Sequence, residues 1–280
     1  MVRKMDPEPD AVTSRSNPNG ITTILINRQH RRNAVDPPTA KKLYQKILDF
    51  ENDASQKVCI LAGANGTFCA GADLHEVAGA GLQQPQSKRE NLQPVKGRNL
   101  APMGPSRLQV KKPVIAAVSG FAVAGGLELS LIADMRVVEE DAVFGVFCRR
   151  WGVPLIDGGT VRLQAIVGLG RALDMILTGR PVDAKEALAM GLANRVVPKG
   201  TALEEAEKIA NQLLAFPQLC MNTDRNSCYY SAYNASSFED AMRNEFENGV
   251  GVVSVESVKG AALFKEGKGR HGKFDEPSRL

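Results

Sequence analysis

Two glycine-bearing turns constrain this chain more than any other feature of its sequence, because each comes after a strand-like apolar run. The first turn is Cys69–Asp73, and the second, Ala124–Glu128, leads directly into a helical pattern. Glycine lets the backbone turn sharply and lets a ligand approach without an intervening Cβ. The first N–H groups of a helix have no internal partners and can bind an anion. Two such donors that converge on one oxygen form an oxyanion hole, so the turns predict a site that stabilises a developing negative charge.

Short apolar runs alternate with helical patterns through the first half of the chain. Residues 21–26, 58–61 and 114–118 are rich in Ile, Val and Leu, which is typical of strands. Asp36-Pro37 opens a helix with proline at an early helical position. Strands that alternate with helices predict an α/β fold whose strands pair mostly in parallel.

The second half of the chain changes from this alternation to helices alone. Asp183 and Glu186 have the spacing of a capping box for a short helix that ends before Gly191. A last strand is expected at 194–197, followed by helical patterns up to residue 266. We therefore predict three parts: an N-terminal tail over 1–20, a core with the active site over 21–198, and a helical oligomerisation region over 199–280.

Composition excludes several classes of function. The chain has 280 residues, 43% of them hydrophobic, and its net charge of +4 is too mild to favour nucleic acid as the main partner. Five scattered cysteines without a C-x-x-C spacing and three histidines predict no metal site and no disulfide framework. Because no apolar run approaches the roughly 20 residues of a membrane helix, we expect no membrane span.

The last three residues, Ser278-Arg279-Leu280, are a conservative variant of the Ser-Lys-Leu peroxisomal address. The polar residues Asp275–Pro277 before them predict an exposed tail. We therefore expect a peroxisomal location, and the alternative is a chance tail on a cytoplasmic protein.

The motifs around both turns resemble those of a known family. Cys69–Leu74 with the run Lys112–Gly120 and the turn Ala124–Glu128 looks like the crotonase superfamily, the enoyl-CoA hydratase/isomerase group. The resemblance extends from about Ile21 to Phe274, and its motifs are specific for the superfamily but not for one reaction within it. Further matching motifs are Asn27-Arg28 with Arg32–Ala34, Ala142–Gly145, Gly158–Thr160, Leu177–Gly179 and Gly191–Ala193.

The resemblance implies a fold and a substrate class. The fold is a spiral of ββα units followed by a helical trimerisation region, assembled as a trimer or a dimer of trimers. The substrate is an acyl-CoA thioester whose carbonyl accepts hydrogen bonds from the N–H groups of Ala72 and Gly125. Coenzyme A is part of this substrate, and no separate cofactor is implied. The residues implied in substrate or coenzyme A binding are Arg28, His30, Arg32, Asn33, Ala70, Asp73, Leu74 and Gly126, with Phe264 and Lys265, the last two often from a neighbouring subunit.

The basic cluster His30-Arg31-Arg32 indicates an anion-binding site independently of the family resemblance. Its charges suit the phosphates of a coenzyme. The alternative is a solvated loop.

Glu128 matches the first of two carboxylates that hydratases of the family use on water and on the α-carbon proton. Its neighbours Leu127 and Leu129 are apolar, and such surroundings raise the pKa of a carboxyl group into the range of a general acid/base. The alternative is an acid that merely favours a helix start through the helix dipole. The second carboxylate is expected twenty residues later, where this chain has Cys148. We expect a packed thiol there, with a nucleophile activated by Arg149 as the alternative.

Asp157 is the candidate for a second acid. It lies where dienoyl-CoA isomerases and an aryl-CoA dehalogenase of the family carry a catalytic Asp, and its alternative role is to cap a helix that starts near Gly158. Arg149, Arg150 and Trp151 could pair with these acids or recognise a carboxylated acyl group, or form structural ion pairs. The irregular segment 79–108 either roofs the substrate pocket or is a solvated excursion.

The resemblance thus implies an acyl-CoA hydratase or lyase, with hydration of a 2-enoyl-CoA as the leading reaction. The alternative within the family is double-bond isomerisation with Glu128 as a single proton shuttle. The alternative from another class is a non-catalytic acyl-CoA-binding or RNA-binding relative.

Overall fold

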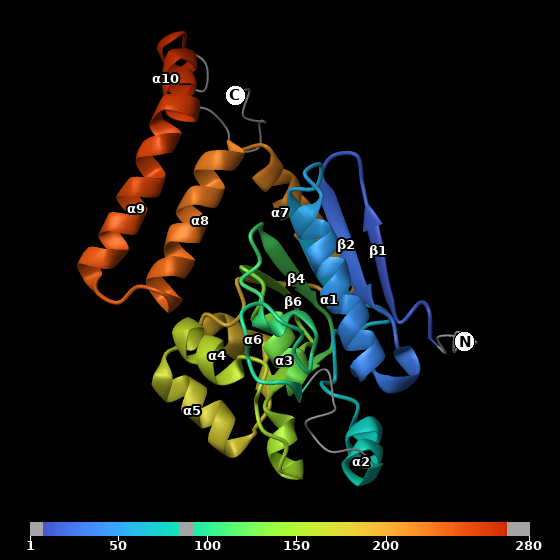
Figure 1. The fold of residues 1–280 in the computed structure, drawn as a ribbon. Helices are drawn as coiled ribbons and strands as arrows, with labels where there is room; N and C mark the ends of the chain where they lie inside the picture. The colour runs from blue at the N-terminus through green and yellow to red at the C-terminus, as the bar shows by residue number, and fades with distance from the viewer. Residues whose placement is uncertain (1–7, 84–91, 268–280) are drawn as a thin grey trace, which may run out of the picture.

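The computed structural model describes residues 8–83 and 92–267 and centres on a six-stranded sheet (Figure 1). Every neighbouring pair of strands is parallel except β1 and β2, which confirms the predicted mostly parallel pairing. In spatial order the strands are β1 (Val12–Ser16), β2 (Ile21–Ile26), β3 (Val58–Gly63), β4 (Val114–Val118), β6 (Met135–Glu139) and β9 (Arg195–Val197).

Each face of this sheet is covered by a helix. Alternate residues of a strand point to opposite faces. Leu61 of β3 belongs to the core that includes α1 (Pro37–Asn52), whereas Ile60 belongs to the core that includes α7 (Ala202–Leu214). Asp36 begins α1 as predicted, because its carboxylate accepts a hydrogen bond from Thr39 N at 2.8 Å.

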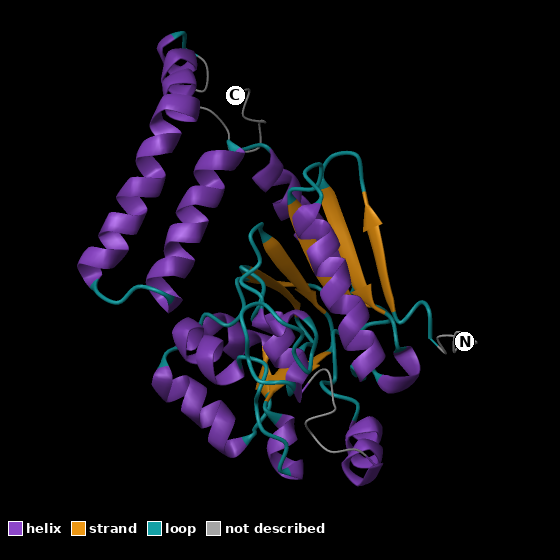
Figure 2. Ribbon diagram, in the orientation of Figure 1, coloured by secondary structure: helices purple, strands orange, loops and turns teal. Residues whose placement is uncertain are grey.

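A second sheet is small and consists of β5 (Phe121–Val123), β7 (Val143–Gly145) and β8 (Val182–Asp183). Further helices lie near this sheet in the lower part of the view (Figure 2). These helices are α2 (Leu74–Gln83), α3 (Gly125–Ser130), α4 (Gly159–Val167), α5 (Leu169–Thr178) and α6 (Ala184–Ala189). Asp183 caps α6 as predicted, since its Oδ1 accepts from Glu186 N at 2.7 Å, whereas the Glu186 carboxylate accepts from Arg180 and does not complete a capping box.

The C-terminal helices extend away from both sheets (Figure 1). They are α8 (Gln218–Tyr233), α9 (Phe238–Val252) and α10 (Val258–Lys265), with a π-helical turn between the last two. Arg225 and Tyr229 of α8 attach them to the core, because both side chains donate to Asp134 Oδ1, at 2.8 and 2.7 Å. Within the described residues, no helix is long and apolar enough to cross a membrane.

Two predicted boundaries differ from the structure. β1 lies inside the predicted tail 1–20, where four of the five residues are partly or fully exposed and therefore give no apolar strand pattern. α7 lies beyond the predicted end of the core at 198 and yet covers the central sheet. Its buried face is built largely from the small side chains of Ala202, Ala206 and Ala210, which give a weak apolar signal. The tripeptide Ser278–Leu280 lies outside the described residues, so the peroxisomal address stays a prediction.

Candidate active site

The two glycine-bearing turns lie against each other. The Cys69 N–H donates to Phe121 O at 2.8 Å, and the Val123 N–H donates to Cys69 O at 3.1 Å. Gly126 permits this approach, because a Cβ at that position would overlap the Cys69 carbonyl oxygen. A Cβ on Gly71, which has φ +99°, would lie 3.1 Å from the Gly125 N atom. Both glycines are therefore required by the close contact of the turns.

Two backbone donors remain unused where the turns meet. Among the described residues, neither the Ala72 N–H nor the Gly125 N–H donates a hydrogen bond to a protein group. Gly125 is the first residue of α3, and Ala124 before it has φ 53°, which turns the chain into the helix. Both residues line one pocket, which is the arrangement that an oxyanion hole requires.

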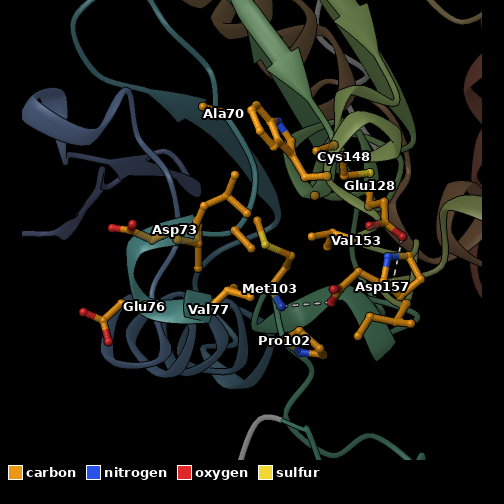
Figure 3. A pocket seen from close by; sticks show the side chains of 18 of the residues that line it. Ala70, Asp73, Glu76, Val77, Pro102, Met103, Glu128, Cys148, Val153 and Asp157 are labelled. Atoms are coloured by element: carbon orange, nitrogen blue, oxygen red, sulfur yellow. Dashed lines mark hydrogen bonds between the residues drawn. The ribbon is translucent and has the colours of Figure 1, made fainter. Parts of the chain in front are cut away.

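The pocket beside these donors has a volume of about 500 Å³ and mostly apolar walls. In Figure 3 the carboxyl groups of Glu128 and Asp157 lie on one side of it, and those of Asp73 and Glu76 lie on the opposite side. The structure thus brings together seven of the predicted site residues, namely Ala70, Ala72, Asp73, Leu74, Gly125, Glu128 and Asp157.

Glu128 is buried in this pocket and is held through one oxygen only. Its Oε1 accepts from the N–H groups of Asp157 at 2.9 Å and Gly159 at 2.8 Å. Within the described residues, Oε2 accepts no hydrogen bond and is left for a substrate. Burial, followed by the charge of Asp157, raises the Glu128 pKa to about 7, although the two backbone hydrogen bonds oppose the shift. A carboxyl group with this pKa can both accept and donate a proton near neutral pH.

Asp157 is buried and faces a different part of the chain. Its Oδ1 accepts from Met103 N at 2.9 Å and from the Ser106 hydroxyl. Burial is the largest influence on the Asp157 pKa and raises it. The predicted capping role is wrong, because the residue before α4 is Gly158, in a left-handed conformation, and no side chain caps this helix.

Cys148 packs in the apolar core, as predicted, and also lines the pocket. Its pKa is raised, first by burial and then by the charge of Glu128. The side chain is therefore a thiol at neutral pH, which argues against the alternative of an activated nucleophile.

The charged residues after Cys148 do not enter the pocket. Arg149 Nε donates to Ile176 O at 3.1 Å, and the Arg150 guanidinium lies over the Phe147 ring at 5.4 Å from its centroid. Neither arginine forms an ion pair with a described residue, so the predicted pairing of these arginines with Glu128 or Asp157 is wrong, and neither lines the pocket. Trp151, in contrast, lines the pocket. The short 3₁₀ turn Phe147–Trp151 buries Cys148 and leaves the two arginines outside.

The predicted coenzyme-binding loop has a buried and an exposed part. Arg28 is buried and forms ion pairs with Asp36 at 3.0 Å and Asp73 at 3.2 Å. Asn33 is also buried, and its amide donates to Thr67 O at 2.6 Å. His30 and Arg32, with Arg31 between them, are exposed.

This exposed basic loop adjoins the first turn, because the Ala70 N–H donates to Arg32 O at 3.1 Å. The other two predicted contacts, Phe264 and Lys265, are exposed on α10, far from the pocket of the same chain (Figure 1).

Met103 is the main pocket residue that sequence reasoning missed. It lies in the segment 79–108, which begins inside α2, and Leu92, Pro102 and Met103 from the described part of this segment line the pocket. This supports the interpretation that the segment helps to enclose the substrate. Pro102 and Gly104 mark a turn in the sequence, but no pattern shows that the side chain between them faces the site.

Comparisons with known proteins show which family this chain is similar to. The enoyl-CoA hydratase/isomerase family model matches residues 16–269. The enoyl-CoA hydratase EchA19 of Mycobacterium tuberculosis is 37% identical over 74% of this chain and 75% of that protein. The short-chain-enoyl-CoA hydratase of Clostridium acetobutylicum is 34% identical over 70% of this chain and 72% of that protein. The crystal structure of enoyl-CoA hydratase EchA1 from Mycobacterium marinum is similar with a TM-score of 0.82 at 29% identity, covering 98% of each chain.

Proposed function

Because the chain belongs to the enoyl-CoA hydratase/isomerase family, we propose that it adds water to the double bond of a 2-enoyl-CoA thioester. One observation carries the proposal. The buried Glu128 carboxyl group, with a pKa of about 7, shares a pocket with the unused N–H groups of Ala72 and Gly125.

The two N–H groups activate the thioester. They donate to its carbonyl oxygen and stabilise the enolate that forms when a nucleophile adds to the β-carbon. Each donor of this kind contributes about 3–4 kcal/mol in the transition state. Since Gly125 begins α3, the helix dipole adds to the stabilisation of the enolate oxygen.

Glu128 moves the proton in this scheme. Its free Oε2 takes a proton from water as the water oxygen bonds to the β-carbon, and the electron pair of the double bond moves into the enolate. Glu128 then returns the proton to the α-carbon, and the electrons of the enolate form the new C–H bond. The sum is the addition of one water molecule, with one carboxyl group acting first as base and then as acid.

Isomerisation is the second candidate, and Cys148 favours it. A neutral thiol stands where the hydratase pattern places its second carboxylate, so this wall of the pocket offers no second base to orient water. Glu128 alone can remove an α-proton from a 3-enoyl-CoA and deliver it to the γ-carbon, while the same enolate is held by Ala72 and Gly125.

The pocket favours an apolar, uncharged acyl group. Among the described residues, its lining contains no Lys, Arg or His but includes four acids, Asp73, Glu76, Glu128 and Asp157. A carboxylate on the acyl chain would lose its hydration and meet like charges. At the other end, the exposed His30, Arg31 and Arg32 beside the first turn suit the phosphates of coenzyme A.

We also propose that the C-terminal helices associate with other copies of this chain. Their described side chains include many exposed apolar groups, more than a solvated helical hairpin needs. Association would also allow Phe264 and Lys265 to reach the coenzyme of a neighbouring copy. The exposed apolar residues are Leu219, Phe238, Met242, Phe246, Val250, Val253, Val255, Val258 and Phe264.

Purified protein given crotonyl-CoA or a 3-enoyl-CoA tests the proposed reaction. Hydration removes the absorbance of the conjugated thioester, whereas isomerisation creates it. Glu128→Gln should lower either rate by at least roughly a hundredfold and leave acyl-CoA binding intact, because it removes only the proton carrier.

Glu140→Gln, an exposed residue outside the pocket, is the matched control and should keep the wild-type rate. Turnover of the 3-enoyl-CoA alone would select the isomerase. Binding of acyl-CoA without turnover of either compound would refute both reactions and leave a non-catalytic binding protein.

A further inference from the structure

We propose that Asp157 is a positioning residue that ties the loop at Met103–Ser106 to the Glu128 carboxyl group and leaves proton transfer to Glu128. This inference rests on the proposed function, because it concerns the same pocket. It assigns a role by contacts, since the sequence motif alone suggests a second catalytic acid.

The backbone and the side chain of Asp157 bind different parts of the site. Its backbone N–H donates to Glu128 Oε1 at 2.9 Å, whereas its side-chain Oδ1 accepts from Met103 N at 2.9 Å and from the Ser106 hydroxyl. The residue is 3% exposed. Figure 3 shows the carboxyl group turned toward Met103. Both donors favour the anion, which opposes part of the rise in the Asp157 pKa caused by burial, and they fix the direction of the carboxyl group.

Met103 extends this connection to the oxyanion hole. Its side chain is fully buried against the second turn, where a Cβ on Gly125 would lie 2.6 Å from the Met103 Sδ atom. Holding the Met103 N–H therefore also holds the wall behind the Gly125 donor. Through Asp157, the proton carrier and this donor are fixed relative to each other by one buried network.

The Asp157 charge also acts on Glu128. Arg162 on α4 is the cation that favours the Glu128 anion, whereas Cys148 on the 3₁₀ turn faces Glu128 as an uncharged thiol. After burial, the negative charge of Asp157 is the largest influence that raises the Glu128 pKa. Loss of this charge should therefore lower the pH at which Glu128 ionises.

Asp157→Asn separates the positioning role from proton transfer. The asparagine keeps an Oδ1 acceptor for Met103 and Ser106 but has no charge. We expect a loss in kcat of less than about tenfold, little change in KM, and an ascending limb of the pH–rate profile that moves to lower pH. Asp157→Ala removes the acceptor as well and should cost at least about ten times more in kcat. Ser106→Ala, which removes one donor, should cost a few-fold.

A proton-transferring Asp157 would behave differently. The kcat of both Asp157→Asn and Asp157→Ala would then fall by about a thousandfold or more, and to a similar extent in the two variants. Equal losses in the two variants, or a wild-type pH profile in Asp157→Asn, would overturn the positioning role. Asp49→Asn, an exposed acid on α1, is the matched control and should change neither rate nor profile.

A second readout keeps this test separate from the proposed reaction. If the wild type turns over neither enoyl-CoA, the reaction is refuted, but the pH dependence of unfolding still reports on Glu128. The stabilisation that comes from neutral Glu128 is lost as pH rises from 4.5 through about 7. In Asp157→Asn this loss should end at lower pH, and an unchanged end point would contradict the electrostatic coupling.

Discussion

Glu128 joins stability and chemistry in one side chain. The buried carboxyl group is fixed through Oε1, and its raised pKa comes mainly from burial. Burial disfavours the charged form, so the folded protein is more stable while Glu128 is neutral. The same proton affinity that suits the residue to proton transfer therefore makes folding less favourable as pH rises.

The sign of this effect gives a prediction for Glu128→Gln. With a folded pKa of about 7 against 4.5, the wild type has the full stabilisation below about pH 4 and loses it as pH rises through 7. Glutamine stays neutral throughout. The variant should therefore match the wild type at about pH 4 and exceed it at pH 8 by up to the order of 3 kcal/mol.

Urea unfolding between pH 4 and 8 measures the difference, with Glu140→Gln as the control. If the free energy of unfolding of Glu128→Gln and of the wild type depended on pH in the same way, folding would not raise the Glu128 pKa.

The sequence predicts single residues well where the signal is local. Glu128 follows from a strand, a glycine turn and a helix start within one short stretch. Asp157 was placed next to a helix start, yet its side chain contacts Met103 and Ser106, which lie 54 and 51 residues earlier. No periodicity or spacing reports such a contact, so both the role of Asp157 and the presence of Met103 in the wall required the structure.

Among the elements, the contact between the two turns places the strictest limit on side-chain size. Gly126 brings α3 against the carbonyl of Cys69, with no space for a Cβ. The strand–turn–helix units themselves were predictable, because each has its own pattern of apolar residues and glycine. The contact between the two turns was not predictable, because the pairing of Cys69 with Ala122 connects segments more than fifty residues apart.

Gly126→Ala should separate the turns. The added methyl group cannot fit against Cys69 O, and overpacking of this kind typically costs about 1–3 kcal/mol of stability. Because the Ala72 and Gly125 donors then move apart, we expect a loss in kcat of about a hundredfold. Steady-state kinetics and thermal unfolding measure the two effects.

Gly170→Ala is the control for this substitution. Gly170 lies in α5, where an added Cβ would contact no atom within 4 Å. Alanine is the better helix former, so the control should be neutral or stabilised by up to about 1 kcal/mol. A Gly126→Ala protein that behaved like this control would show that the turns do not need their close contact.

At the scale of the whole molecule, the pocket and the C-terminal hairpin lie apart. The sequence predicted the helices of this region but not that α7 belongs to the core, because its buried face is mostly alanine. Exposed apolar side chains then remain on α8, α9 and α10. The described contacts with the core include the bonds from Arg225 and Tyr229 to Asp134.

Phe246→Asp tests the proposed self-association. Phe246 lies on α9 with 69% of its surface exposed, so the change should not disturb the fold of one copy. A charge in an apolar contact should shift the protein to smaller species in sedimentation at micromolar concentration. Asn248→Asp adds the same charge to the same helix without removing an apolar group. This variant should shift the size distribution less than Phe246→Asp does. An unchanged size distribution for Phe246→Asp would exclude this face as the contact.

The pocket wall extends in sequence from Val35 to Asp157 and depends on pairs such as Met103 with Asp157. Chains whose contacts bridge long stretches of sequence fold slowly, because loops must close before those contacts can form. The α8–α9 hairpin, by contrast, closes through four residues between Tyr233 and Phe238. In kinetic terms, a helical hairpin can form early, whereas the acid and the donors of the pocket come together only when the central sheet is complete. Partly folded chains would therefore expose the apolar side chains of the C-terminal helices, and could associate through them, before the active site has formed.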